Sequence, residues 1–203
     1  MLASVALASL ALACAEPSPV APSVAPTASP IAPATGPTSA GATVTGVGGG
    51  GRRTTELMER HRGRIVATAS STWPSWGPER LVDGDPATSW FSQKGDAAAN
   101  GTKPWVELRF PVDVDVKRVS VLGNREPNWP RGFTIHYGML ELIDANGKVL
   151  ATIKNEGKNV AADVDFPIKA PISRVRAVRF TSLMDDGDQT QFKDIALAEV
   201  LVD

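Results

Sequence analysis

Short stretches in which apolar and polar residues alternate dominate the chain from Arg64 onward. The clearest is 105–110, whose sequence WVELRF places Val106, Leu108 and Phe110 on one face of an extended strand. Gly, Pro, Asp and Asn separate these stretches, and an Asn-Gly pair at 146–147 predicts a tight hairpin turn. Regularly spaced short strands with almost no helical periodicity predict an all-β fold, either a sandwich or a barrel. The stretches expected to form strands are 65–68, 105–110, 117–122, 133–137, 140–143, 148–153, 160–166, 175–180 and 195–202.

The composition changes sharply near Gly51. Before this residue the chain consists almost entirely of Ala, Pro, Ser, Thr, Val and Gly, with Glu16 as its only charged side chain. Prolines recur every few residues, which prevents helices and sheets from propagating, and little bulky apolar surface is present to offset the entropy of ordering. We therefore expect a disordered linker at 15–51, a short helix within 52–63 and one sandwich domain at 64–203.

The only cysteine, Cys14, follows an apolar run over residues 1–13. That run is too short for a membrane span, which needs about 20 residues, but it suits the apolar core of a signal peptide. A small residue before the cysteine and a Pro-rich segment after it resemble the lipobox of bacterial lipoproteins, although Ala11 stands where Leu is usual and no Lys or Arg precedes the run. The resemblance implies a signal peptide at 1–14, lipidation of Cys14, and export to the bacterial cell envelope with a lipid anchor at the outer membrane or cell surface. An ordinary cleaved signal peptide, with Cys14 incidental, is the alternative.

Four segments of the expected domain follow one another in a distinctive order. The sequence ASS at 69–71 precedes PERLVDGDPATSW at 78–90, whose first five residues are expected to form a helical turn. KPWVEL at 103–108 and IALAEV at 195–200 follow. In order and spacing these segments resemble the discoidin family, also called the coagulation factor V/VIII type C domain, of the galactose-binding-like superfamily. The resemblance covers the whole expected domain and implies an all-β, jelly-roll β-sandwich of about eight antiparallel strands.

The segment that starts at Asp83 is rich in hard oxygen ligands. Asp-Gly followed by Asp-Pro makes two successive turns, and turns expose carbonyl oxygens beside two carboxylates and the Thr88 hydroxyl. Oxygens of this kind suit calcium. The alternative is that Asp83 and Asp85 only cap the turns. The family resemblance implies a structural calcium ion, Ca²⁺, held by side-chain or carbonyl oxygens of Arg80, Asp83, Asp85, Thr88, Ala198 and Glu199.

Three tryptophans lie in two loops that also contain proline, 72–76 and 124–131. Exposed indoles beside Arg, Asn and Glu suit sugars, because the C–H face of a sugar ring packs on an aromatic ring and its hydroxyls need paired donors and acceptors. A third loop, 184–189, offers further acceptors. Packing of the loop tryptophans in the core is the alternative, whereas Trp90 and Trp105 are expected in the core. The candidate ligand-binding residues, placed by the family resemblance at one end of the sandwich, are Trp73, Trp76, Asn124, Arg125, Asn128 and Trp129.

Neither nucleic-acid binding nor catalysis is indicated. The formal net charge of −1 offers no basic field for nucleic acid. Of the two histidines, His61 lies in the charged lead-in segment and His136 is expected to point outward from a strand. Asp185 and Asp186 are more typical of a solvated turn than of a glycosidase pair. We expect a non-catalytic, surface-tethered module that binds carbohydrate and contacts the membrane through its lipid anchor only. The alternative is an envelope lipoprotein that binds a protein or lipid partner through the same loops.

Overall fold

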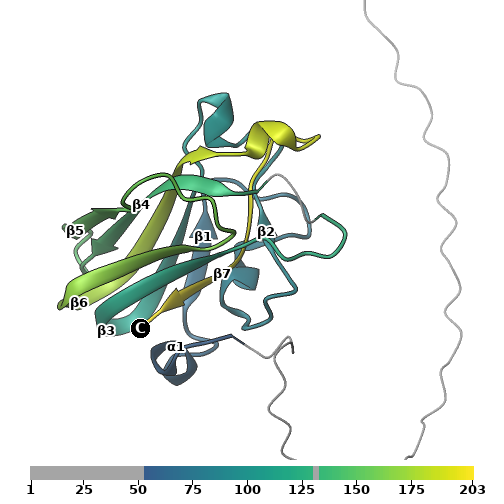
Figure 1. Cartoon of the computed structure of the whole chain (residues 1–203). Helices are drawn as coiled ribbons and strands as arrows, with labels where there is room; N and C mark the ends of the chain where they lie inside the picture. The colour runs from purple at the N-terminus through teal and green to yellow at the C-terminus, as the bar shows by residue number, and fades with distance from the viewer. Residues whose placement is uncertain (1–52, 130–132) are drawn as a thin grey trace, which may run out of the picture. The chain divides into compact units, whose positions relative to one another are not determined.

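The computed structural model describes residues 53–129 and 133–203 (Figure 1), so the expectations for the signal peptide, Cys14 and the linker lie outside the described residues. Every pairing between its strands is antiparallel, which confirms the predicted all-β sandwich class. Within the described ranges, no helix has the length and apolar character needed to cross a bilayer. The elements are α1 (Glu56–Arg60), β1 (Val66–Ala69), η1 (Pro78–Val82), β2 (Trp90–Phe91), η2 (Ala98–Asn100), β3 (Trp105–Gly123), β4 (Ile135–Ile143), β5 (Val149–Lys154), β6 (Val164–Asp185), η3 (Gly187–Gln189) and β7 (Ala196–Val202).

Two strands, β3 and β6, are longer than expected because each joins two of the predicted stretches. β3 runs through both 105–110 and 117–122, and its register with β6 shifts between Arg109 and Arg118, where the ribbon bends without ending. The first part of β3 pairs with β1, whereas its last part pairs with β7. The ribbon of β3 and β6 therefore belongs to both layers of the sandwich, and the strand order is β2-β7-β3-β6-β4-β5.

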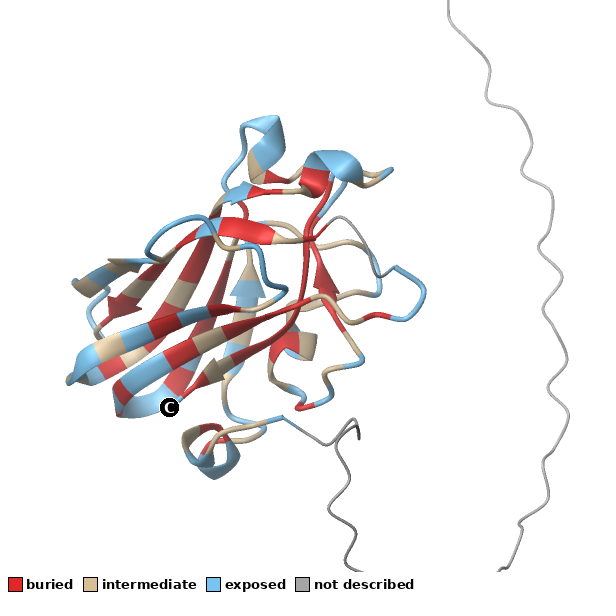
Figure 2. Ribbon diagram, viewed as in Figure 1, coloured by how far each residue is buried: buried red, intermediate tan, exposed pale blue. Residues whose placement is uncertain are grey.

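The core lies between the two layers. The alternation of apolar and polar residues in β3 predicts which of its side chains enter this core. Val106, Leu108 and Phe110 are all buried, and Figure 2 shows buried residues, in red, along the strands of the sandwich. On β4, Gly138 has no room for a side chain, because a Cβ atom there would lie 2.4 Å from the ring of Phe180. The β4 backbone thus approaches the aromatic core so closely that only glycine fits.

The two tryptophans expected in the core have different surroundings. Trp90 is fully buried, and its indole N–H donates to the carbonyl oxygen of Ser71 at 3.1 Å. Trp105 is partly exposed, so the expectation for this residue is wrong. The same alternation that buries Val106 turns its neighbour outward, where the guanidinium of Arg179 lies 4.8 Å from the Trp105 ring centroid.

His136, which was expected to point outward, is buried with 8% of its surface exposed. The pairing of β4 with β6 is irregular on both sides of Tyr137, which breaks the strict alternation and leaves Tyr137 exposed instead. Nδ1 of His136 lies 2.7 Å from the carbonyl oxygen of Asn159, and Nε2 lies 2.8 Å from Oδ1 of Asp186. His136 is thus a structural bridge between β4 and the segments on either side of it.

Asp185, expected in a solvated turn, is only 4% exposed. Its carboxylate accepts hydrogen bonds from the Ser182 hydroxyl at 2.6 Å and from the backbone N–H groups of Ala98, Ala99 and Gly187 at 2.9, 3.2 and 3.1 Å. The expectation of a solvated turn is wrong, because these hydrogen bonds bury the carboxylate between η2 and η3, two segments that are far apart in the sequence. The carboxylate is fully engaged in holding the two turns at one end of the sandwich.

The first described residues contact the sandwich at the end opposite to η2 and η3. α1 begins after Thr55, whose hydroxyl oxygen accepts the N–H of Met58 at 3.2 Å and whose hydroxyl donates to the carbonyl of Val202. β7 begins at Ala196, near η3, and ends at Val202. A strand of this length spans about 20 Å, and Figure 1 shows α1 and η3 at opposite ends of the molecule.

Candidate functional site

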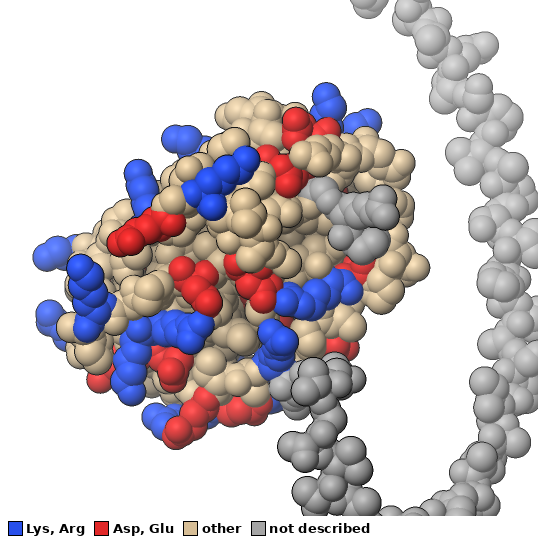
Figure 3. All heavy atoms as spheres, viewed as in Figure 1, with Lys and Arg blue, Asp and Glu red and all other residues tan. Residues whose placement is uncertain are grey.

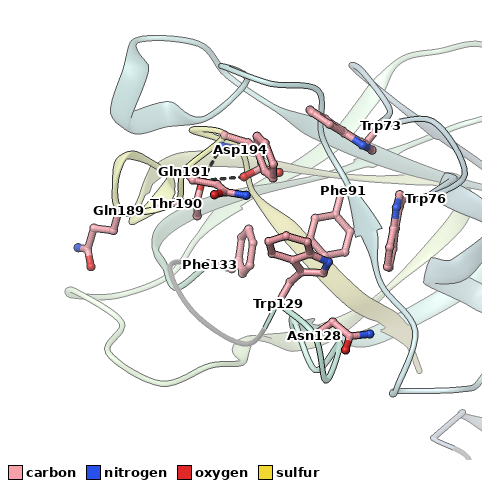
Figure 4. Close-up of a pocket in the computed structure, with 11 residues that line it drawn as sticks. Trp73, Trp76, Phe91, Asn128, Trp129, Phe133, Gln189, Thr190, Gln191 and Asp194 are labelled. Atoms are coloured by element: carbon pink, nitrogen blue, oxygen red, sulfur yellow. Dashed lines mark hydrogen bonds between the residues drawn. The ribbon is translucent and has the colours of Figure 1, made fainter.

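A half-open cavity of about 540 Å³ lies at the end of the sandwich that carries η3. Figure 4 shows its lining, in which aromatic rings and short polar side chains face a common space. The residues come from the loop before η1, from β2, from the loop before β4 and from the segment that joins η3 to β7. The aromatic members are Trp73, Trp76, Phe91, Trp129, Phe133 and Phe192, and the polar members are Asn128, Gln189, Thr190, Gln191 and Asp194.

The loop that carries Trp73 and Trp76 is fixed by backbone hydrogen bonds to β2. The Trp73 N–H donates to the Phe91 carbonyl at 2.9 Å, and the Phe91 N–H donates to the Trp76 carbonyl at 3.3 Å. Between the two tryptophans, Ser75 has a φ of 69°, a left-handed conformation that non-glycine residues seldom adopt. Both indoles are therefore held in place by the backbone and by a conformation that surrounding contacts must enforce.

The aromatic rings form a floor and a rim. On the floor, the Phe91 ring lies 4.7 Å from Trp76 and 5.4 Å from Phe133, measured between centroids, with edge-to-face geometry in both pairs. On the rim, the Phe192 ring lies 5.1 Å from Trp73 and 5.9 Å from Trp129. Phe91 and Phe133 are buried, whereas Trp129 has 41% of its surface exposed. The floor rings are thus part of the packing, and the rim rings are available to a ligand.

Phe192 was not among the residues selected from the sequence, although it contacts two of them. It lies in the segment TQFKD at 190–194, where an isolated aromatic residue among polar neighbours is the only sequence signal. The segment is held firmly: the Gly95 N–H donates to the Phe192 carbonyl at 2.9 Å, and the Asn100 amide donates to the Lys193 carbonyl at 3.0 Å. Lys193 itself has a φ of 55°, so a second strained residue borders the cavity.

Asp194 is the polar residue set deepest in the cavity lining, with 3% of its surface exposed. The Thr190 hydroxyl donates to its Oδ1 at 2.7 Å, and the Asp194 N–H donates to the same hydroxyl oxygen at 3.1 Å. Burial raises the pKa of the Asp194 carboxyl, and the hydrogen bond from Thr190 opposes that shift. This residue also escaped selection from the sequence, because it immediately precedes the apolar run of β7.

The structure brings four of the six selected ligand-binding residues, Trp73, Trp76, Asn128 and Trp129, to the cavity lining. The other two, Asn124 and Arg125, lie outside that lining and maintain the shape of their loop.

Arg125 donates to both carboxylate oxygens of Asp163 at 2.9 and 2.8 Å and to the Gly123 carbonyl at 2.9 Å. Asn124 accepts the Glu126 N–H at 3.1 Å and donates its amide to the Trp129 carbonyl. Because both side chains are engaged within the protein, their direct contact with a ligand is not supported by this geometry.

Arg80, whose carbonyl was assigned to calcium, has its side chain against the aromatic wall. Its guanidinium carbon lies 4.5 Å from the Trp76 ring centroid, and Nη2 donates to the Ser75 carbonyl at 3.1 Å. A cation stacked on an indole in this way is held electrostatically by the ring. The side chain therefore supports one face of Trp76 from outside the cavity.

The acidic cluster predicted to hold calcium forms a compact turn. Asp83 accepts the Asp85 N–H at 2.7 Å and the Thr88 hydroxyl at 2.8 Å, and Asp85 accepts the Ala87 N–H at 3.0 Å. Glu199 on β7 is fully buried beside this turn. Burial, together with the negative charge of Asp83, raises the pKa of the Glu199 carboxyl to about 9.

The carboxylate of Glu199 is the strongest indication that this cluster takes a cation. Its oxygens lie against the Asp83 carboxyl and the Gly84 backbone, and among the described residues neither oxygen makes a hydrogen bond of ordinary geometry. A buried carboxylate without such bonds is costly unless a cation or a proton neutralises it. Among the described residues, no group of three or more His, Cys, Asp or Glu side chains is placed to hold a metal ion, so a cation here would need carbonyl and hydroxyl oxygens as well. Such oxygens are the ligands that calcium accepts, and the donor set fits that ion.

The antiparallel sandwich, the shared ribbon of β3 and β6, and the cavity between loops at one end define a β-sandwich domain of the discoidin type. The family model described as the F5/8 type C domain matches residues 66–198. The chain belongs to this family, which confirms the resemblance seen in its sequence segments. A comparison with the curated proteins found no match to this chain.

Solved structures with the same fold include several domains with bound sugars. The lectin domain of lectinolysin complexed with Lewis B antigen has 18% identity and a TM-score of 0.55, over 74% of this chain and 98% of that one. The family 32 CBM of C. perfringens NanJ in complex with galactose has 16% identity and a TM-score of 0.52, over 68% and 92%. Chitosan-binding module 1 of a chitosanase/glucanase from Paenibacillus sp. IK-5 has 18% identity and a TM-score of 0.51, over 68% and 93%. At these identities the likeness establishes a shared fold.

Proposed function

We propose that this domain is a carbohydrate-binding module whose ligand occupies the aromatic cavity. The observation that carries the proposal is the combination of one exposed rim ring, Trp129, and two partly exposed ones, Trp73 and Phe192, with amide and carboxyl side chains around one half-open space. Sugars present apolar C–H faces and dense hydroxyl groups, so they need both kinds of partner at once. Trp129 and Phe192 supply the faces, and Asn128 and Gln191 supply groups that donate and accept hydrogen bonds.

Two further features support a sugar over other ligands. Structures of similar fold include domains in complex with Lewis B antigen and with galactose, as well as a fucose-binding module and a chitosan-binding module. Figure 3 shows basic and acidic side chains interspersed over the viewed face, with no extended basic surface of the kind that nucleic acids require.

The proposed role is non-catalytic binding. His136 has acceptors at both ring nitrogens, and Asp185 accepts four hydrogen bonds that hold η2 and η3 in place. Both side chains are therefore committed to structure. We further propose that the lipobox-like segment ending at Cys14 anchors the protein to the cell envelope, with residues 15–51 as its tether.

We also propose that Asp83 and Glu199 hold a structural calcium ion, with Thr88 and nearby carbonyl oxygens completing the ligand set. The ion would neutralise the two adjacent carboxylates and fix the turn after η1 against β7. The fully buried carboxylate of Glu199, which lies beside the carboxylate of Asp83, supports this assignment. Because the cluster lies outside the cavity lining, the ion would stabilise the fold and would not contact the sugar.

The proposed function is tested with a glycan array probed by the purified full chain, followed by calorimetry on the sugars that bind. Trp129→Ala is expected to weaken binding at least about tenfold, because stacking on an indole contributes more than 1.4 kcal/mol. Trp105→Ala is the matched control, since it removes an equally large, partly exposed ring that does not line the cavity. Failure of the folded protein to bind any sugar, or equal affinity of the Trp129→Ala protein, would overturn the proposal and direct the search to a protein or lipid partner.

A further inference from the structure

Three rings on the rim of the cavity contact one another in series. Phe192 lies between the other two, with its centroid 5.1 Å from that of Trp73 and 5.9 Å from that of Trp129. All three line the cavity, and they come from three separate loops. The rings are tilted to one another, by 41° between Phe192 and Trp73 and by 59° between Phe192 and Trp129, so a flat sugar ring that stacks on one of them does not stack on the next. A single pyranose ring can therefore stack on part of this series but cannot cover it.

The polar side chains of the lining are not spread evenly along the series. Figure 4 shows Gln189, Thr190, Gln191 and Asp194 gathered on one side of the cavity, while Trp73 and Trp76 stand on the other and Asn128 lies apart from both groups, beyond Trp129. The backbone around Trp73 is occupied by its hydrogen bond to Phe91. One side of the cavity can thus recognise individual hydroxyl groups, whereas the other offers mainly an aromatic surface.

We propose that the cavity contains two subsites and takes an oligosaccharide of at least two units, an inference that rests on the proposed carbohydrate binding. The first subsite lies between Phe192 and Trp129, where the polar side chains select the sugar. The second lies on Trp73, where the next unit of the chain stacks. The cavity of about 540 Å³ is larger than a single pyranose fills, which agrees with this arrangement.

The two subsites contribute differently because hydrogen bonding and stacking discriminate differently. A site that pairs with a particular hydroxyl rejects sugars that lack it, since its own polar groups are then left buried and unpaired. Stacking on an indole depends mainly on the apolar area covered and has little directionality. The first subsite therefore sets which sugar is bound, and the second adds affinity for longer chains with little selectivity.

The test measures affinity against chain length with the purified full chain. Galactose, fucose and glucosamine are compared with di- and trisaccharides that contain them, by calorimetry. In the unmodified protein the second unit is expected to raise affinity by about tenfold, as one stacked ring does elsewhere. In Trp73→Ala this gain from the second unit is expected to disappear, whereas Trp129→Ala is expected to lose affinity for monosaccharides and longer chains alike.

The outcomes separate this inference from the function on which it rests. A monosaccharide that binds as tightly as its trisaccharide would overturn the second subsite and leave carbohydrate binding intact. Equal losses for monosaccharide and trisaccharide in Trp73→Ala would also overturn it. If none of the sugars binds the folded protein, both proposals fail together. The chain-length comparison on the unmodified protein decides the question even where Trp73→Ala does not fold.

Discussion

Replacing Glu199 by glutamine tests the electrostatics of the acidic cluster directly. The Glu199 carboxyl is fully buried, and its pKa is raised from 4.5 to about 9, chiefly by burial and then by the charge of Asp83. Between these two values the folded protein keeps a proton that the unfolded chain has lost. The free energy of unfolding therefore falls as the pH rises, by about 1.4 kcal/mol for each pH unit. This contribution is complete below pH 4.5 and is lost progressively up to about pH 9.

The interval from 4.5 to 7 corresponds to about 3 kcal/mol in metal-free buffer. Glutamine has nearly the same shape and no proton to lose, so Glu199→Gln is expected to remove this dependence. At pH 7, without divalent cations, the variant should be more stable than the unmodified protein by up to about 3 kcal/mol, or roughly 10 °C in melting temperature. Calcium should reverse the order, because only the ionised glutamate is a good ligand for it.

The measurement is urea denaturation at pH 5 to 8, once with chelator and once with calcium. Glu56→Gln on α1 is the matched control, since that glutamate side chain is 86% exposed and its loss should leave the pH dependence unchanged. If the free energies of unfolding of the unmodified protein and of Glu199→Gln show the same slope against pH in chelator, the buried-carboxyl argument is refuted. Equal stabilisation of both proteins by calcium would place the ion elsewhere.

Two further substitutions test how the backbone is held. Asn100→Asp should weaken sugar binding about tenfold, because the side-chain amide that donates to the Lys193 carbonyl at 3.0 Å becomes a carboxylate that repels this carbonyl. Calorimetry at pH 7 measures the affinity, and an unchanged value would show that the segment around Phe192 keeps its position without this hydrogen bond. Gly138→Ala should lower the free energy of unfolding by about 1–3 kcal/mol, because its Cβ would lie 2.4 Å from the Phe180 ring; a urea midpoint equal to that of the unmodified protein would contradict the close approach.

Local patterns predict those parts of the fold in which strand geometry is regular. The alternation at 105–110 correctly separates Val106 and Leu108 from the outer face, because nothing interrupts the period of two there. At His136 the same rule fails, because irregular pairing around Tyr137 shifts the register and no residue type marks that irregularity. The long strands β3 and β6 were divided in the prediction for a related reason, since a bend looks like a strand end when only one chain segment is considered.

The candidate site was predictable to the extent that a residue's own chemistry determines its place. Trp73 and Trp129 stand out as large rings in proline-containing loops, and both line the cavity. Arg125 was misplaced because its partner, Asp163, is 38 residues away in the sequence, and that ion pair turns the side chain away from the cavity. Phe192 was missed because its role depends on contacts with two other loops, which the sequence around it does not reveal.

The position of the first strand has a mechanical consequence. The described chain begins beside Val202, at the end of the sandwich opposite to the cavity, and β1 then runs toward the loop that carries Trp73. A pull on residue 53 would first load the contacts of the segment that precedes β1, where the Arg53 N–H donates to the Gly84 carbonyl at 3.3 Å and the Thr55 hydroxyl donates to the Val202 carbonyl, and would reach β1 only after these contacts give way. The register of β1 with β3 joins Val66–Ala69 to four partners, so such a force would shear these bonds together and would not open them one by one. The pairing of β1 with β3 is therefore the second set of bonds that a force applied at residue 53 meets, and it is the stronger one because its bonds share the load.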